Sequence, residues 1–452
     1  MTLVQLRYFG TDGIRGIFGE PPLDPPFLRR LGYALAGNLA LRNPGRRLQV
    51  VFGRDPRISG PAILSALAEG FLAGGHRVVD IGVVPTPVVP EALRERQADF
   101  GVMITASHNL PSDNGVKFFD HNGLKLDDDE EAEIETWIDQ MHAPEKPSVL
   151  PAVEESEALE SYRMQRTNLL PPHALAGWVI AVDCGHGATC ATTPEVFRRL
   201  GADVRARAAN PDGTRINTDG GSEHPEHLAA LVRASHANLG VAHDGDGDRL
   251  VVCDETGAFV DGDELLGIFA LHALRTGTLK QNLVVATVQS NLGLDLALEA
   301  AGGRLVRVPV GDRQVLHKLL ELGASFGGEN SGHYIFADVS RCGDGLLAAL
   351  QLVRVLRETK RALSDLRKEI ALLPQLTANL RVQVKKPFAE LPLFAEALRG
   401  AEVALRGRGR VLARYSGTEK KLRLLVEGPA PQELESLLSA LKLAAGRELG
   451  AV

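Results

Sequence analysis

The sequence predicts an α/β fold in which three related α/β domains with mixed sheets precede a smaller α+β domain. Three observations lead to this prediction. Short apolar runs alternate with amphipathic stretches, and one strand–helix–strand plan occurs three times. After Pro374 the pattern changes to one typical of antiparallel strands. Alternating strands and helices are typical of α/β layers rather than of a sandwich or a helical bundle.

Six short apolar runs have the length and composition of buried strands. They are 48–53 (LQVVFG), 77–82 (RVVDIG), 99–105 (DFGVMIT), 178–183 (WVIAVD), 238–244 (NLGVAHD) and 282–288 (NLVVATV). Between them, 61–75 and 193–202 carry apolar residues at helical spacing. Loops at the carboxyl ends of such strands usually bind the ligand in open α/β sheets.

The recurring plan occupies 50–82, 179–206 and 283–308. Each segment contains a strand, a turn of small residues, a helix, a glycine-containing turn and a second strand. The pattern favours three related domains, and chance similarity among βαβ units is the alternative. The Pro- and Glu-rich segment 141–160 predicts the first boundary. The predicted domains are 1–150, 151–256, 257–370 and 371–452.

The last predicted domain has a different texture. Four segments after Pro374 predict antiparallel strands, with one helix between them and one after them. They are 376–384, 401–407, 409–417 and 421–428. This pattern indicates a small α+β unit.

Composition narrows the class of protein. The chain has 50 basic and 57 acidic residues, a net charge of −7, which argues against a nucleic-acid partner. Its four cysteines form no C-x-x-C pair and are too few for a disulfide scaffold, as expected of a reducing cytoplasm. No uncharged apolar run approaches the roughly 20 residues of a membrane span, and no signal-peptide core is found. We therefore expect a cytoplasmic protein without a membrane partner.

The first polar motif follows the run 99–105 and contains Ser107, His108 and Asn109. A serine beside a histidine suggests a nucleophile for acyl transfer. That reaction requires a base within hydrogen-bond reach of the serine hydroxyl. Neighbouring side chains of extended backbone point apart, and no G-x-S-x-G elbow surrounds Ser107. Acyl transfer is therefore disfavoured, and capping of a turn by these residues stays open.

In the second motif, single glycines separate Asp244, Asp246 and Asp248. Extended backbone would point all three carboxylates the same way. Three anions together need a cation, and oxygen ligands suit Mg²⁺ or Ca²⁺. Glu255 occupies the twelfth position of an EF-hand-like loop, but Arg249 replaces the glycine required at the sixth, which excludes an EF-hand. A solvated acidic turn is the alternative to a metal site.

The third motif, 327–334 (GGENSGHY), places Glu329, Asn330, Ser331 and His333 among glycines. Such a loop can bind a polyol through several hydrogen bonds because glycines let a ligand approach the backbone. A plain polar turn is the alternative.

The fourth motif, 414–423 (RYSGTEKKLR), offers hydroxyls, backbone N–H groups and guanidinium forks, which are the usual means of binding phosphate. Its candidate residues are Arg414, Ser416, Gly417, Thr418 and Arg423. A nucleic-acid patch is the rival interpretation, but only Tyr415 supplies an aromatic ring. A solvated basic hairpin is the other alternative.

The strings TASHN, DGDGDR, GENSGH and RYSGTE, in this order and spacing, resemble the four signature loops of the α-D-phosphohexomutase superfamily. The resemblance covers essentially the whole chain, with one loop in each domain and the active-site cleft between the four. FGTDGIRG, NGVKFF, TVQSNLGLDLAL and VGDR resemble its phosphoglucosamine mutase branch. That branch interconverts glucosamine 6-phosphate and glucosamine 1-phosphate on the route to UDP-N-acetylglucosamine. A phosphoglucomutase or phosphomannomutase is the alternative.

The resemblance also implies roles for single residues. It makes Ser107 the phosphoserine, and it places Mg²⁺ on Ser107, Asp244, Asp246 and Asp248. Lys117 becomes a candidate for proton transfer at the sugar hydroxyl. The other implied catalytic residues are Arg15, Arg249 and His333, and the implied substrate-binding residues are His108, Glu329, Ser331, Arg414, Ser416, Gly417, Thr418 and Arg423.

The same resemblance implies a glucosamine 1,6-bisphosphate intermediate, with this compound or glucose 1,6-bisphosphate as activator, a small-molecule sugar phosphate as substrate, and a homodimer. Two positions depart from the superfamily pattern. Leu110 follows SHN where proline is usual, and Lys420 follows SGTE where proline is usual. The shape of both loops therefore stays open.

Overall fold

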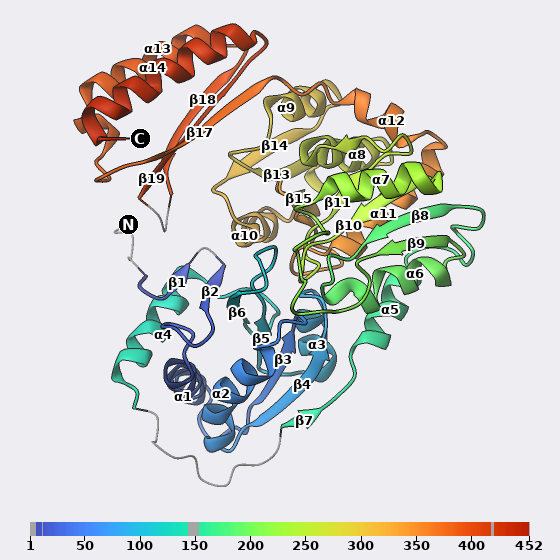
Figure 1. Cartoon of the computed structure of the whole chain (residues 1–452), viewed down its shortest axis with the longest axis vertical. Helices are drawn as coiled ribbons and strands as arrows, with labels where there is room; N and C mark the ends of the chain where they lie inside the picture. Colours follow the sequence, from blue (N-terminus) through green and yellow to red (C-terminus); the bar gives the residue numbers. More distant parts are fainter. Residues whose placement is uncertain (1–5, 11, 143–152, 417–419, 452) are drawn as a thin grey trace.

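The computed structural model describes residues 6–10, 12–142, 153–416 and 420–451, which form four β-sheets in chain order (Figure 1). The first three sheets contain parallel strand pairs and are joined to helices, whereas the fourth is wholly antiparallel. This arrangement confirms the predicted fold class.

The first sheet has seven strands in the order β1-β2-β6-β5-β3-β4-β7. Its strands are β1 (Phe9–Gly10), β2 (Gly13–Ile17), β3 (Gln49–Arg54), β4 (Arg77–Val83), β5 (Phe100–Ile104), β6 (Asp113–Phe119) and β7 (Glu154–Glu155), and its helices are α1 (Pro25–Arg42), α2 (Gly60–Ala73), α3 (Val88–Arg96) and α4 (Asp128–Gln140). β3 buries both faces: Val50 and Phe52 pack in the cluster that contains α1 and α2, and Val51 packs with α3. Burial on both faces explains the uninterrupted apolar run of this strand.

The second sheet has the order β12-β11-β10-β8-β9. Its strands are β8 (Val179–Asp183), β9 (Asp203–Arg207), β10 (Leu239–Ala242), β11 (Val251–Cys253) and β12 (Phe259–Val260), and its helices are α5 (Leu159–Thr167), η1 (Ala188–Ala191), α6 (Thr193–Arg199) and α7 (Pro225–Ser235). β10 runs parallel to β8 and antiparallel to β11. The acidic motif therefore lies in the loop at the carboxyl end of β10.

The third sheet has the order β14-β13-β15-β16. Its strands are β13 (Leu283–Thr287), β14 (Arg304–Val308), β15 (Phe326–Gly328) and β16 (Tyr334–Phe336), and its helices are α8 (Gly262–Arg275), η2 (Lys280–Asn282), α9 (Leu292–Ala300), α10 (Asp312–Leu322), α11 (Gly345–Thr359), α12 (Leu363–Leu366) and η3 (Arg367–Glu369). The turn between β15 and β16 carries the third polar motif.

The fourth sheet is antiparallel, in the order β17-β19-β18. Its elements are β17 (Gln375–Arg381), η4 (Phe388–Glu390), α13 (Pro392–Leu405), β18 (Arg410–Tyr415), β19 (Lys421–Glu427) and α14 (Pro431–Leu449). The strand predicted over 401–407 is wrong, because α13 continues to Leu405. Phe394, Ala401 and Leu405 are buried at helical spacing, and this face packs under the sheet.

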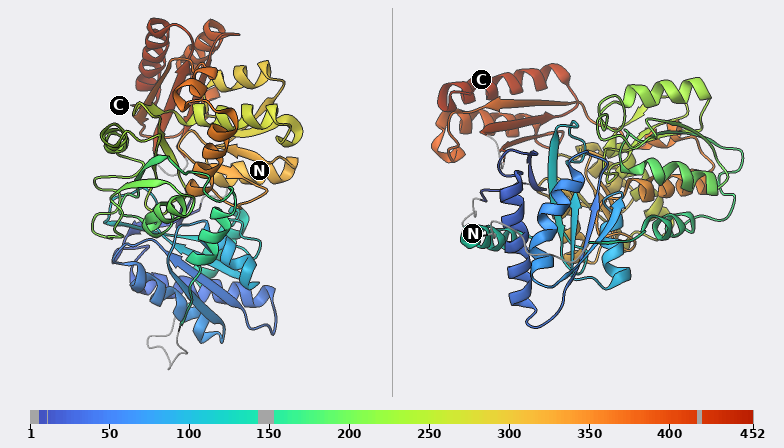
Figure 2. Two further views of the ribbon diagram at one scale, coloured as in Figure 1. Left: turned by 90° about the vertical axis from the view of Figure 1, so that its right-hand side faces the viewer. Right: turned by 60° about the horizontal axis from the view of Figure 1, so that its bottom comes forward.

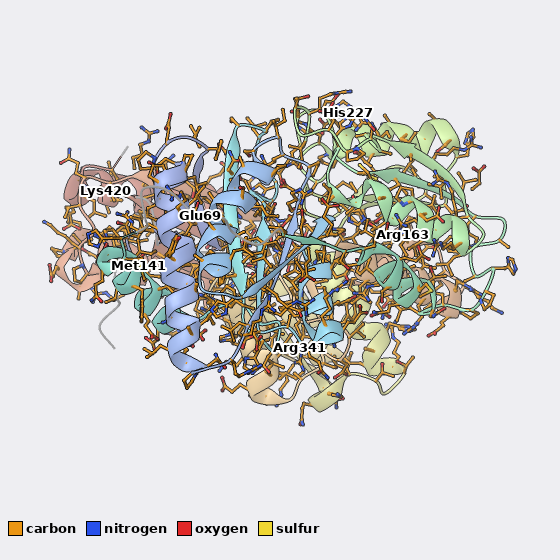
Figure 3. All side chains as sticks on the ribbon, turned by 90° about the horizontal axis from the view of Figure 1, so that it is seen from below. Glu69, Met141, Arg163, His227, Arg341 and Lys420 are labelled. Carbon is orange, nitrogen blue, oxygen red and sulfur yellow. The ribbon has the colours of Figure 1, made fainter. Side chains whose placement is uncertain are left out.

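One continuous apolar cluster joins the first three units and contains Met103, Val182, Leu250 and Ala286. The fourth unit, with α13 and α14, stands at one end of the molecule (Figures 1 and 2). Seen from below, Lys420 lies on the opposite side from the second unit (Figure 3). None of the helices in the described ranges is both long and apolar enough to cross a membrane.

The predicted domain boundaries stay predictions. The boundary at 150 lies outside the described residues. β7 follows that boundary in the sequence, yet Glu154 pairs with Val79 of β4 in the first sheet. Similarly, β12 follows the boundary at 256, yet Phe259 pairs with Cys253 in the second sheet. Short segments after these two predicted boundaries therefore complete the preceding sheet.

Candidate active site

Ser107 lies in the loop that follows β5, with its backbone in the left-handed region at φ 51°. Its side chain is buried, and its hydroxyl donates to Asp244 Oδ2 at 2.6 Å. Its amide donates to Thr105 Oγ1 at 2.8 Å. A serine rarely adopts positive φ, so the surrounding contacts must hold this conformation.

His108 does not point away from Ser107, as extended backbone would require. Its Nδ1 lies 3.4 Å from Ser107 Oγ, because the left-handed turn at Ser107 rotates the two side chains together. Burial, together with the nearby positive charge of Arg249, lowers the pKa of His108 to about 4. The sequence predicted that the side chains of Ser107 and His108 point apart. That prediction is wrong, because the hydroxyl and the imidazole are neighbours.

Asp244, Asp246 and Asp248 are buried in the loop after β10, and one ligand oxygen from each lies within 4.8 Å of the others. They converge in a turn, with Gly247 at φ 70°, and not along extended backbone as the sequence pattern suggested. Burial and the charges of Asp248 and Asp246 raise the pKa of Asp244 well above its usual range. The three carboxylates therefore meet as predicted, by a different local geometry.

Lys117 projects from β6 into this group of carboxylates. Its ammonium lies 2.9 Å from Asp246 Oδ2, 3.0 Å from Asp248 Oδ2 and 3.0 Å from Asp12 Oδ2. Burial lowers the pKa of Lys117, but the three carboxylates outweigh burial and hold that pKa well above its ordinary value. Lys117 is therefore a buried cation that offsets part of the negative charge.

The acceptors of the acidic loop suit a metal ion. Asp246 Oδ1 is buried and has no hydrogen-bond partner among the described residues. The other oxygen of Asp246 accepts from Thr86 Oγ1 at 2.6 Å, in addition to Lys117. An unpartnered carboxylate oxygen among three aspartates is the donor chemistry that Mg²⁺ prefers, so these residues fit that ion.

The turn between β15 and β16 contacts the acidic loop through His333. His333 Nε2 lies 3.1 Å from Asp248 Oδ1, and its Nδ1 lies 3.1 Å from Glu329 Oε2. Burial lowers the pKa of His333, but Asp248 and Glu329 outweigh burial and raise it to about 10. Ser331 is exposed beside them, with Oγ 3.4 Å from His333 Nδ1. The third motif thus reaches the first two.

Two arginines border the same group. Arg15, on β2, donates to the Ala106 carbonyl at 3.3 Å. Arg249 follows the acidic loop, and its Nε lies 4.0 Å from Asp244 Oδ2. Both guanidinium groups are partly exposed. They form a positively charged border beside buried carboxylates.

The fourth motif lies on a different sheet. Arg414 of β18 stands directly opposite Arg423 of β19, and the two line a cavity of about 290 Å³ with Gln289 and Thr377. Burial and the charge of Arg423 lower the pKa of Arg414. Ser416 is buried at the end of β18. Gly417 and Thr418 lie outside the described residues, and their contribution stays a prediction.

Comparison with known proteins covers all four units. Models of the phosphoglucomutase/phosphomannomutase family match as α/β/α domain I at residues 6–145, domain II at 160–257, domain III at 261–372 and the C-terminal domain at 378–443. The chain belongs to the phosphoglucomutase/phosphomannomutase family. It is therefore an enzyme, a phosphohexomutase that works as an intramolecular phosphotransferase.

Relatives match this phosphohexomutase over nearly its whole length. The phosphoglucosamine mutase of Solidesulfovibrio magneticus is 43% identical, covering 98% of this chain and 99% of its own. That of Symbiobacterium thermophilum is 43% identical, covering 96% and 98%. A solved phosphoglucomutase/phosphomannomutase family protein from Burkholderia thailandensis superposes with a TM-score of 0.81 at 26% identity, covering 98% of this chain and 97% of that one. An N-acetylphosphoglucosamine mutase of Aspergillus fumigatus, solved with GlcNAc-6P and magnesium, shares the fold (TM-score 0.64, 17% identity, covering 98% and 96%).

Among the residues that sequence patterns missed, Asp12 and Thr86 contact Lys117 and Asp246 of this phosphohexomutase. Asp12 binds Lys117 and also lies 2.7 Å from Lys125 Nζ. Thr86 donates both its amide and its hydroxyl to Asp246. Thr86 follows β4, so its position at the carboxyl end of a predicted strand was a usable signal. Asp12 lies inside the string FGTDGIRG, from which the resemblance assigned a role only to Arg15.

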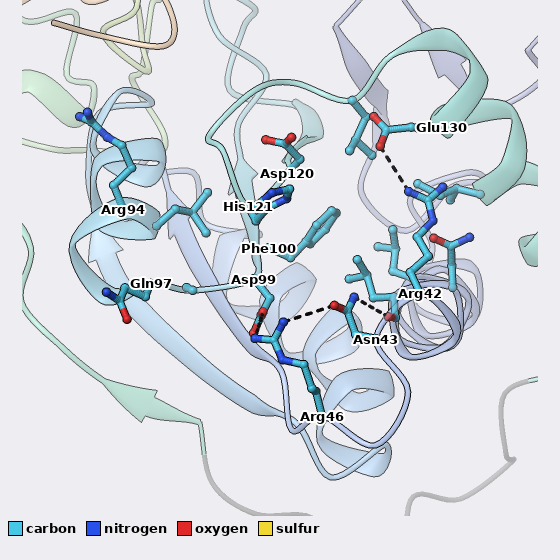
Figure 4. A pocket seen from close by; sticks show the side chains of 17 residues that line it. Arg42, Asn43, Arg46, Arg94, Gln97, Asp99, Phe100, Asp120, His121 and Glu130 are labelled. Atoms are coloured by element: carbon cyan, nitrogen blue, oxygen red, sulfur yellow. Dashed lines mark hydrogen bonds and ion pairs between the residues drawn. The ribbon is translucent and has the colours of Figure 1, made fainter.

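A sizeable cavity lies away from the candidate site. A cavity of about 660 Å³ lies on the first unit of this phosphohexomutase, between α1, α3 and the start of α4 (Figure 4). Arg42 pairs with Glu130 at its rim, and Arg46 pairs with Asp99. Its lining contains neither Ser107 nor any residue of the acidic loop.

Proposed function

We propose that Ser107 carries the phosphoryl group of a phosphoglucosamine mutase, which interconverts glucosamine 6-phosphate and glucosamine 1-phosphate. The observation that carries this proposal is the hydrogen bond from the Ser107 hydroxyl to Asp244, within a loop that contains three buried aspartates. A hydroxyl beside a site for a divalent cation is equipped for phosphoryl transfer, which depends on positioning and neutralised charge.

Asp244, Asp246 and Asp248, with an oxygen on Ser107, would hold Mg²⁺. The unpartnered Asp246 Oδ1 and the raised pKa of Asp244 support this assignment, because both describe a site with too little positive charge. When bound, Mg²⁺ neutralises charge on the transferring phosphoryl group. Lys117 contributes a further positive charge 2.9 Å from Asp246 Oδ2.

In the forward direction, the phosphorylated Ser107 donates to the free hydroxyl of a bound monophosphate. The P–O bond to the serine breaks and the P–O bond to the sugar forms. The proton that the sugar hydroxyl loses is balanced by the proton that Ser107 Oγ takes up when its hydroxyl is restored. The product is a 1,6-bisphosphate, which turns around so that its other phosphate returns to Ser107. Lys117 stays a candidate for proton transfer, as a proton donor, because its three carboxylate partners keep it charged. Arg15 and Arg249 offset the charge of the phosphates.

The remaining residues would orient the sugar. Glu329, Ser331 and His333 offer hydrogen bonds to its hydroxyls from one turn, with His108 near the transferring phosphate. Arg414, Ser416 and Arg423, together with Gly417 and Thr418, would hold the phosphate that is not transferred. The opposed pair Arg414 and Arg423 supports this, because two like charges facing each other on a sheet favour a bound anion.

The choice of an amino sugar rests on the relatives that share 43% identity, which are named phosphoglucosamine mutases. The family description also names phosphoglucomutase and phosphomannomutase, so glucose or mannose phosphate is the second candidate substrate. A glucosamine or glucose 1,6-bisphosphate would serve as activator. We also propose that the protein is cytoplasmic and forms a homodimer. Light scattering on the purified protein would test the dimer.

The deciding experiment compares kcat/KM for glucosamine 1-phosphate and glucose 1-phosphate, with Mg²⁺ and a trace of bisphosphate. We expect a preference for the amino sugar of at least about tenfold, which corresponds to about 1.4 kcal/mol. Equal or reversed values would keep the mutase chemistry and assign the enzyme to hexose phosphates. Release of inorganic phosphate without isomerisation would contradict the mutase proposal.

A further inference from the structure

Arg57 is a buried arginine beside the loop that carries Ser107, and its side chain is 1% exposed. Its Nη2 donates to the Ser107 carbonyl at 3.2 Å and to the Asn109 carbonyl at 2.8 Å. Its Nη1 donates to the Asp113 carbonyl at 2.8 Å and to the Leu110 carbonyl. A single guanidinium group thus binds four carbonyls of one loop.

Asp55 connects Arg57 to the other side of Ser107. Arg57 Nε donates to Asp55 Oδ2 at 3.0 Å, and the same oxygen accepts from the Thr105 hydroxyl at 2.7 Å. The Thr105 oxygen in turn accepts the Ser107 amide at 2.8 Å. The amide and the carbonyl of Ser107 are therefore both linked to the Asp55–Arg57 ion pair.

Asn217 holds the same loop from the second unit. Its Nδ2 donates to the Ser107 carbonyl at 2.8 Å and to the Asn109 carbonyl at 2.9 Å. The backbone N–H of Asn217 donates to the Gly185 carbonyl at 2.9 Å, and Gly185 lies in the loop after β8. Asn217 is buried. The Ser107 carbonyl consequently accepts one donor from each of two units.

These donors are fully used. An arginine side chain has five N–H donors, and those of Arg57 are directed at Asp55 and the four loop carbonyls. Both N–H donors of the Asn217 side chain are directed at Ser107 and Asn109. Neither residue retains a donor for a sugar or a phosphate, so direct binding of substrate is not their part.

We propose that Arg57 and Asn217 are positioning residues, which hold Ser107 in the left-handed conformation that points its hydroxyl at Asp244. A serine at φ 51° persists only when its surroundings over-determine it, and these two side chains supply the carbonyl contacts that do so. The inference rests on the proposed role of Ser107 as phosphoryl carrier. Loosening the loop would misplace the hydroxyl without altering Glu329, Ser331, Arg414 and Arg423, which lie outside this loop and would bind the sugar and its second phosphate.

The test uses Asn217→Ala and Arg57→Lys in the full-length enzyme, assayed with glucosamine 1-phosphate under saturating Mg²⁺. Lysine retains the charge that Asp55 needs but cannot bind four carbonyls at once. We expect kcat to fall by about tenfold or more in each variant, with KM within about twofold of the wild-type value. Asn38→Ala is the matched control, since Asn38 is a buried asparagine that binds Glu133 in the first unit.

Thermal unfolding of all variants separates positioning from general stability. A lowered kcat at a Tm equal to that of Asn38→Ala supports the inference. A kcat within about twofold of wild type in whichever variant folds, or a raised KM with unchanged kcat, overturns it. Ser107→Ala, assayed in parallel, keeps the two proposals apart. If that variant is active, the phosphoserine proposal fails; if it is inactive while Asn217→Ala is unimpaired, only the positioning inference fails.

Discussion

The hydroxyl of Ser107 donates a 2.6 Å hydrogen bond to Asp244, a residue 137 positions further along the chain. Ser107 follows β5 of the first sheet and Asp244 follows β10 of the second. The contact exists because the carboxyl ends of two sheets face each other, which is the usual place for a ligand in α/β proteins. Changes to either residue therefore test the site directly.

Replacing Ser107 with alanine removes the proposed phosphoryl carrier. We expect turnover to fall by about a thousandfold or more, because no other group takes the nucleophile's place. The Tm should stay close to that of wild type, and a coupled mutase assay measures the activity. Ser65→Ala, at an exposed position of α2, is the matched control. Near-normal turnover in Ser107→Ala would end the phosphoserine account.

Asp246→Asn replaces the carboxylate whose Oδ1 lacks a partner in the described structure. We expect the half-saturating Mg²⁺ concentration to rise by at least about tenfold. Mutation of a residue that only supports a metal ligand already lowers metal affinity by about this factor. A titration of activity against Mg²⁺ measures this shift, with Asp203→Asn at an exposed position as control. An unchanged titration would remove Asp246 from the metal site.

Arg414→Ala removes one guanidinium group from the fourth sheet. We expect KM to rise by about 10- to 100-fold with a smaller change in kcat, because a hydrogen bond to a charged phosphate contributes about 1.5–3 kcal/mol. Arg408→Ala is the control, since Arg408 is exposed and its hydrogen-bond partners among the described residues belong to its own unit. If KM stays at the wild-type value, Arg414 does not contact the substrate.

Asp263 links stability to pH. Burial raises the pKa of this carboxyl from its ordinary value to about 7. Because the folded-state pKa lies above the unfolded value, this group favours folding most at low pH, and its contribution is lost as pH rises through about 7. Between about pH 4.5 and about pH 7.5, the Tm of wild type should therefore fall more steeply than that of Asp263→Asn.

Two other carboxyls have the same sign of effect. Burial raises the pKa of Glu91 and of Glu131 to about 7, so part of the pH dependence persists in the variant. The difference between the two curves isolates Asp263. Parallel curves would show that Asp263 does not titrate in this range.

Strand positions followed from the sequence because buried parallel strands are continuous apolar runs. The run 178–183 contains β8 (Val179–Asp183), and 282–288 contains β13 (Leu283–Thr287). The segment 401–407 was misassigned because Val403 and Leu405 are equally compatible with a strand. Its helical state depends on the preceding turns, in which Phe394 begins the buried face.

The chemical groups of the candidate site were also predictable, but their geometry was not. Asp244, Asp246 and Asp248 were expected to converge through extended backbone, whereas a turn at Gly247 brings them together. Arg57 and Asn217 carry no pattern that distinguishes them from other polar loop residues. Their importance arises from hydrogen bonds to main-chain carbonyls, and such bonds depend on tertiary structure that a single sequence does not encode locally.

The positive φ of Ser107 also limits which amino acids can evolve at this position. Threonine carries a hydroxyl of similar reactivity, yet its branched side chain is a genuine outlier in the left-handed region. Replacement of Ser107 by threonine is therefore disfavoured by the backbone conformation. The backbone, more than the reactivity of the oxygen, restricts this position to serine.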